Sequence, residues 1–283
     1  MTSFLRPPAL PAEELLLLLR EWCPEAEVAR AATDTGVDVV GVRVPSERAR
    51  DVWETGRRRH GETGWWPYVT SASPERVAEY HARRGCDAAE WERAVGEAVC
   101  QDHDARAASV VVSVFRWSTQ GLPFDDEDFQ SWRDDYDPDR LAPLLGPAVV
   151  GPRLGVPRWA IGSSAISSGM RWINLVAARG GYEVPVLLPH LYSNPNWFGH
   201  GDRCLTPLDD AALLRRWQEQ WGAQLFFATG PYLELVVDRP PLDPQGAAQA
   251  TTELFAYCDD TVQNLVGTGD GMARSTMWSL WWD

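Results

Sequence analysis

Histidine, cysteine and aspartate residues gather in two short segments of the sequence, 190–204 and 258–260. A histidine beside a cysteine can accept the thiol proton, and a carboxylate can orient that histidine, so these residue types could assemble a nucleophilic cysteine site. The candidate binding residues in the two segments are Trp197, His200, Asp202, Cys204, Cys258, Asp259 and Asp260. Their spacing fixes no common geometry, so no catalytic residue is assigned from the sequence.

Zinc binding is the second chemistry that these residue types allow. The nitrogen and sulfur ligands would come from His190, His200, Cys204 and Cys258. Gaps of ten and then four residues along the 190–204 segment do not resemble a repeated zinc motif, so we predict no metal and no cofactor. The alternative for the cysteines is a buried position in the core. For Asp259 and Asp260 the alternative is the capping of a helix.

The acidic segment 125–139 is a third candidate, because its eight carboxylates are interleaved with aromatic residues. These carboxylates cannot all be buried and ionised, since an unpaired buried charge is strongly unfavourable. One interpretation is a surface that attracts a basic protein, with Trp132 and Tyr136 as apolar anchors. The other is a solvated amphipathic helix whose aromatic residues pack inward, and both interpretations stay open.

Composition limits the classes of partner. The 40 acidic and 26 basic residues give a net charge of -14, which repels nucleic acid and anionic membranes, so neither is expected as a partner. Five cysteines without a C-x-x-C motif indicate reduced thiols. The leucine run 15–19 is far shorter than the ~20 apolar residues of a membrane span, and no basic region precedes it as in a signal peptide. A soluble, cytoplasmic protein is therefore expected.

Helical and strand patterns alternate along the chain. Periodicity and capping predict helices over 11–22, 45–59, 74–84, 88–102, 206–221 and 243–257, and a short helix from Asp260. Strands are expected over 37–44, 65–70, 110–115, 171–177, 183–188, 224–228, 232–237 and 278–282. The last of these carries aromatic residues on both faces, which favours a central strand. The pattern predicts an α+β fold, a mixed sheet with helices packed on it, ending in a strand-helix-hairpin-helix-strand unit.

The acidic, proline-rich stretch 123–157 interrupts this pattern. We interpret it as a connector or surface excursion between an N-terminal α+β region, residues 1–122, and a C-terminal α+β domain, residues 158–283. Whether the two halves are separate domains is not decided by the sequence.

Five separated motifs occur in order in the C-terminal part of the chain. They are Leu214-Arg215-Arg216-Trp217, Trp221-Gly222-Ala223, Leu233-Glu234-Leu235, Tyr257-Cys258 and Trp281-Trp282-Asp283. Together they resemble the bacterial family called domain of unknown function 4253, over roughly residues 185–283. The motif Gly64-Trp65-Trp66-Pro67 resembles one that is often found upstream in the same proteins. The resemblance implies no activity.

The chain departs from the pattern of that family at two places. Family members often carry Trp-Asn-x-Cys-Pro before the helix and a histidine in its first turn, where this chain has Gly201-Asp202-Arg203-Cys204-Leu205 and then Asp210. Asp259 follows Cys258 where the family often has proline. A family site at these positions would be altered here.

The sequence favours a partner-binding protein, of an immunity-like or regulatory kind, because it holds no complete catalytic motif and a strong acidic surplus. A basic protein is the expected partner. The alternative is an enzyme or small-molecule binder that uses the 190–204 loop with Cys258, Asp259 and Asp260. Convergence of these residues in one pocket would favour the alternative.

Overall fold

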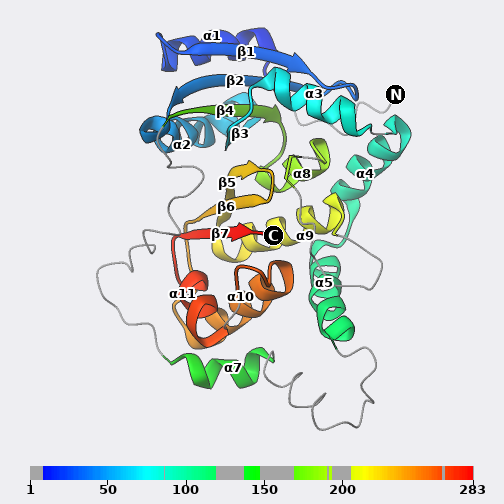
Figure 1. The fold of residues 1–283 in the computed structure, drawn as a ribbon, viewed down its shortest axis with the longest axis vertical. Coiled ribbons are helices and arrows are strands. Elements are labelled where there is room, and N and C mark those ends of the chain that lie inside the picture. Colours follow the sequence, from blue (N-terminus) through cyan, green and yellow to red (C-terminus); the bar gives the residue numbers. More distant parts are fainter. Residues whose placement is uncertain are drawn as a thin grey trace.

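The computed structural model describes residues 9–85, 87–118, 137–146, 169–189, 191–192, 205–262 and 265–282. Its centre is a seven-stranded mixed sheet in the order β1-β2-β4-β3-β5-β6-β7, running in Figure 1 from β1 at the top to β7 near the middle. The strands are β1 Glu27–Ala32, β2 Asp38–Pro45, β3 Trp65–Thr70, β4 Met170–Ala177, β5 Ala223–Thr229, β6 Tyr232–Val237 and β7 Met277–Trp281. The described pairs are antiparallel except β3 and β5, which run parallel.

Helices cover both faces of the sheet, as the α+β pattern predicts. They are α1 Ala12–Trp22, α2 Ser46–Thr63, α3 Pro74–Arg84, α4 Ala88–Cys100, α5 His103–Ser118, α7 Pro138–Leu145, α8 Val184–Leu187, α9 Pro207–Trp221, α10 Pro244–Tyr257 and α11 Asp270–Ala273. A 3-10 turn at Gly181–Glu183 precedes α8, and a π-helical turn at Leu265–Gly269 precedes α11. Helices α1 and α2 pack on one face of the sheet. The larger core on the other face includes residues of α3, α4, α5, α8, α9 and α10.

Local capping signals place the two C-terminal helices where the sequence predicts them. Thr206 is the N-cap of α9 and forms a capping box with Asp209, and the helix ends at Gly222, which has a left-handed φ of 65°. Asp243 caps α10 through the N–H of Gly246. Both helices begin with proline, whose missing N–H has no helical partner to lose at that position.

The parallel junction between β3 and β5 is reinforced by a tryptophan from α2. The indole Nε1 of Trp53 donates to the carbonyl of Pro67 in β3 at 2.9 Å and to that of Leu225 in β5 at 3.1 Å. A fully buried ring therefore bridges the backbones of two strands whose parallel ladder is short, with Val69 opposite Phe227.

Two predicted strands are wrong. Residues 110–115 belong to helix α5, where Ala107, Val110 and Val114 share one buried face at helical spacing. Residues 183–188 form the end of the 3-10 turn and α8, in which Pro185 lies in the first helical turn. Proline cannot donate to a sheet ladder, which disfavours a strand there.

Strand β7 is an edge strand, so its predicted central place is also wrong. It is nevertheless covered on both faces, because Met277 packs in one core while Trp278 and Leu280 pack in the other. Aromatic residues on both sides of a strand thus indicated covered faces rather than two strand neighbours. Strand β1 was not predicted, since its sequence is rich in alanine and it is partly exposed.

The sheet includes strands from both sides of the expected connector. Strand β4 follows that segment in sequence and lies between β2 and β3, which precede it. Within the connector, α7 packs on α10 through Leu141, Ala142 and Ala248. The domain boundaries themselves stay a prediction.

Candidate functional site: a cavity at the ends of β3 and β5

A cavity of about 310 Å³ lies where the parallel strands β3 and β5 end. Parallel strands present their carboxyl ends at the same edge of a sheet, and ligands of open sheets commonly bind in the crevice between diverging connections at that edge. Here β3 leads into α3 while β5 turns back into β6. The cavity is lined by Thr70, Ser71, Ala72, Arg76, Val77, Tyr80, His81, Leu188, Leu191, Tyr192, Thr229 and Gly230.

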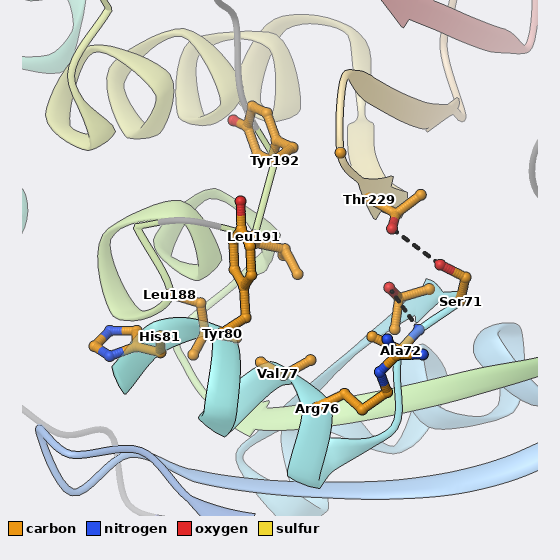
Figure 2. A pocket seen from close by; sticks show the side chains of 12 residues that line it. Ser71, Ala72, Arg76, Val77, Tyr80, His81, Leu188, Leu191, Tyr192 and Thr229 are labelled. Atoms are coloured by element: carbon orange, nitrogen blue, oxygen red, sulfur yellow. Dashed lines mark hydrogen bonds between the residues drawn. The ribbon is translucent and has the colours of Figure 1, made fainter. Parts of the chain in front are cut away.

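Polar groups gather on one side of the cavity. Figure 2 shows Arg76, Ser71 and Thr229 on this side. The hydroxyls of Ser71 and Thr229 are 3.1 Å apart, so the loop after β3 is tied to the end of β5. Arg76 lies in the first turn of α3, which begins at the N-cap Ser73.

Apolar and aromatic groups form the opposite side, where Leu188 and Leu191 face the ring of Tyr80 (Figure 2). Arg84 holds that ring, because it donates to the Tyr80 hydroxyl at 2.8 Å and its guanidinium lies 5.3 Å from the ring centroid. The neighbouring His81 is buried, with Nδ1 2.5 Å from the Asp34 carboxylate. These contacts preorganise the α3 wall of the cavity.

A buried hydrogen-bonded chain begins at the wall formed by Tyr192. The hydroxyl of Tyr192 is 3.1 Å from that of Tyr257, which donates to Oδ1 of Asp210 at 2.8 Å. Burial, together with the charge of the neighbouring Asp209 carboxylate, raises the pKa of Asp210 to about 7. The ring of Tyr192 also stacks on that of Trp282, at 6.2 Å between centroids. A carboxyl group that titrates near neutrality therefore lies two hydrogen bonds behind the cavity wall.

The other buried carboxylates nearby have cationic partners. Asp209 accepts from Nε of Arg106 at 2.8 Å and completes the cap of α9. Glu253 on α10 accepts from Nε of Arg216 at 3.0 Å and from the indole of Trp217 at 2.8 Å. Within the described residues, Asp210 forms no ion pair and is satisfied by a phenol. Asp210 therefore differs from Asp209 and Glu253 because no cationic side chain in the described ranges compensates its charge when it ionises.

Of the candidates from the sequence, Cys258 is a buried thiol at the end of α10. Its Sγ donates to the carbonyl of Trp281 at 3.0 Å and lies 3.2 Å from the hydroxyl of Thr261. Burial raises the pKa of the Cys258 thiol to about 12, which opposes the thiolate that nucleophilic chemistry needs. Thr261 also accepts the N–H of Trp281, so these two side chains cap the outer edge of β7.

Asp259 and Asp260 are partly exposed in the turn that follows Cys258. Partial burial raises the pKa of the Asp259 carboxyl, and the charge of Asp260 adds to this effect. Their side chains do not line the cavity. Residues 263 and 264 of the short helix predicted from Asp260 lie outside the described residues.

The remaining candidates lie outside the described residues. They are Trp132, Tyr136, His190, Trp197, His200, Asp202 and Cys204. Whether the 190–204 loop converges with Cys258 therefore stays a prediction. Across the described ranges, no group of three or more histidine, cysteine, aspartate or glutamate residues is placed to hold a metal ion.

Sequence reasoning missed the residues that line the cavity, because they come from three distant segments around 70–81, 188–192 and 229–230. The available signal was the Thr70-Ser71-Ala72-Ser73-Pro74 stretch, a strand end followed at once by a helix cap. Asp210 was noted only as a departure from a family pattern. Its burial against Tyr257 has no signature in local spacing.

The fold and the cavity define an α+β protein with an open mixed sheet and a pocket at its parallel junction. Residues 172–283 match the model of the family described as Domain of unknown function (DUF4253), which confirms the resemblance for the C-terminal part of the chain. Neither the curated proteins nor the solved structures gave a match. The matched residues include Thr229 and the hydrogen-bonded Tyr192, Tyr257 and Asp210, whereas Arg76 and Tyr80 precede the matched region.

No helix in the described ranges has the length and apolar character needed to cross a bilayer.

Proposed function

We propose that this protein binds a small molecule in the cavity at the ends of β3 and β5. The observation that carries the proposal is the meeting of a fixed polar side, at Ser71 and Thr229, with an apolar side, at Leu188 and Leu191, around about 310 Å³ of space. Small-molecule sites are concave, of roughly 300–1,000 Å³, mostly apolar, and oriented by a few polar groups. The cavity has each of these properties.

A small-molecule binder is the alternative function expected from the sequence, with its site at the 190–204 loop and Cys258. The present proposal keeps that class of function but places the site at other residues. The buried thiol of Cys258 does not line the cavity. Binding of a basic protein partner stays a prediction, because its proposed anchors Trp132 and Tyr136 lie outside the described residues. The cavity gives the small-molecule class an observed site, so we favour it.

Ligand-observed NMR tests the proposal with simple benzene derivatives: benzoate, benzamide and benzylamine. We expect at least one of them to bind the wild-type protein. Leu191→Trp, which enlarges a partly buried side chain of the cavity wall, should abolish that binding. The matched control is Leu17→Trp, the same substitution on α1 at a side chain that is 58% exposed and does not line the cavity.

A second variant guards against local misfolding around residue 191. Ala72→Leu narrows the cavity from the opposite side, and its thermal unfolding should remain cooperative. Loss of binding in both cavity variants, with binding retained in Leu17→Trp, supports the site. Undiminished binding in both cavity variants would place the ligand elsewhere and refute the proposal, as would a wild-type protein that binds none of the probes.

A further inference from the structure

The charge around the cavity differs from that of the whole chain. The protein has 40 acidic residues and a net charge of -14, yet none of the twelve residues that line the cavity is acidic. The same wall contains Arg76, whose guanidinium is a cation. The described cavity wall therefore includes the cation of Arg76 and no acidic side chain.

The guanidinium of Arg76 is available to pair with an anionic ligand. Within the described residues it forms no ion pair, while two nearby carboxylates already have partners. On α3, Glu79 is bound by Arg83, and beside the helix the Asp34 carboxylate contacts His81. A guanidinium presents parallel N–H donors whose spacing matches the two oxygens of a carboxylate.

The hydroxyl pair next to Arg76 offers a further donor. Ser71 and Thr229 have two hydroxyl protons between them, and their mutual hydrogen bond uses one. The other proton is left for a third group. A cation with an adjacent hydroxyl donor favours an acceptor that is negatively charged.

The opposite wall of the cavity determines which chemical group suits the rest of the ligand. Leu188, Leu191 and the ring of Tyr80 present carbon surface, and Arg84 fixes the position of that ring. An apolar or aromatic group is stabilised there because it leaves water. The polar and apolar sides are on opposite sides of the cavity in Figure 2, so one small molecule can reach both.

We infer that the cavity binds a small organic anion, a carboxylate on an apolar or aromatic body, with the carboxylate at Arg76 and the body against Leu188 and Leu191. This inference rests on the proposed function and adds the chemical class of the ligand.

Isothermal titration with benzoate, its neutral analogue benzamide and the cation benzylamine tests the inference. Benzoate should bind at least about tenfold more tightly than benzamide, a difference of ~1.4 kcal/mol, and benzylamine most weakly. Arg76→Gln should remove the preference for benzoate while leaving the affinity for benzamide unchanged. Arg20→Gln, at an exposed position on α1, makes the same change in net charge away from the cavity and should keep the preference.

The outcomes separate the two proposals. If benzamide binds as tightly as benzoate and Leu191→Trp abolishes both, the cavity is a ligand site but the anionic class is wrong. A preference for benzoate that survives Arg76→Gln would also overturn the inference. Phenyl phosphate serves as a further arm, and tighter binding of it than of benzoate would contradict the carboxylate assignment. Absence of binding by every probe would refute both the ligand class and the proposed function.

Discussion

The hydroxyl of Tyr257 donates a 2.8 Å hydrogen bond to the carboxyl group of Asp210 in the interior of the protein. The Tyr257 hydroxyl also contacts that of Tyr192, whose ring forms part of the cavity wall. Burial raises the pKa of both tyrosines well above that of a free phenol, so they stay neutral donors. Of these three hydrogen-bonded residues, Asp210 is therefore the one whose pKa lies near neutral pH.

The pKa of Asp210 predicts a pH-dependent effect of Asp210→Asn on stability. Its pKa is about 7 in the folded protein and 3.8 as the ordinary value, so between these pH values the folded state holds the extra proton. The contribution of Asp210 to folding stability is present at low pH and is lost as the pH rises from about 4 to about 7. Asparagine does not ionise, so Asp210→Asn should gain ~2–4 kcal/mol relative to wild type over this range.

Urea unfolding of both proteins at several pH values from about 4 to about 8 measures this difference. Asp51→Asn, at an exposed position on α2, is the matched control and should show no comparable trend with pH. A difference between wild type and Asp210→Asn that does not change with pH would contradict the assignment of the raised pKa.

The cysteines are predicted to differ sharply in reactivity. Cys100 is exposed, whereas the Cys258 thiol is buried with a pKa raised to about 12. Because the thiolate is the reactive form, iodoacetamide at about pH 8 should modify Cys100 and spare Cys258 until urea unfolds the protein. Peptide mass spectrometry follows both sites in one sample. Equal rates of modification at the two sites in the folded protein would revive Cys258 as a candidate nucleophile.

Trp278 is expected to be a major contributor to stability in the C-terminal core. Its fully buried ring makes edge contacts with Trp217 and Trp221 of α9, and its indole N–H donates to the carbonyl of Ala273. Trp278→Ala should lower the free energy of unfolding by ~3–5 kcal/mol. Chemical denaturation compares it with Trp281→Ala, which removes a partly exposed ring from the same strand and should cost less than half as much. Equal losses would show that the edge strand is not anchored by its buried face.

Features encoded by adjacent residues were predictable from the sequence. The caps of α9 and α10 depend on Thr206, Pro207, Asp243 and Pro244, which act within one turn of the chain. The edge position of β7 was not predictable from its aromatic pattern, because that pattern reports what covers the faces of a strand. The insertion of β4 between β2 and β3 depends on pairing across more than 100 residues, such as Val40 with Leu175.

For the candidate site too, features of adjacent residues were visible in the sequence, whereas features that depend on packing were not. Cys258 and its two aspartates attracted attention because they are reactive types in sequence proximity, but the thiol proved to be held by Trp281 and Thr261. The cavity could not be inferred, since its lining depends on where β3 and β5 end beside each other. Likewise, the raised pKa of Asp210 is caused by burial that only the packed structure reveals.

A crystal structure of the protein soaked with benzoate tests the central claim most directly. We predict density for the probe in the cavity, with its carboxylate within hydrogen-bond distance of the Arg76 guanidinium and its ring against Leu188 and Leu191. In the soaked Leu191→Trp crystal the indole should occupy this space and the probe should be absent. Benzoate bound only at another site, with the cavity left without it in wild-type crystals, would contradict the claim.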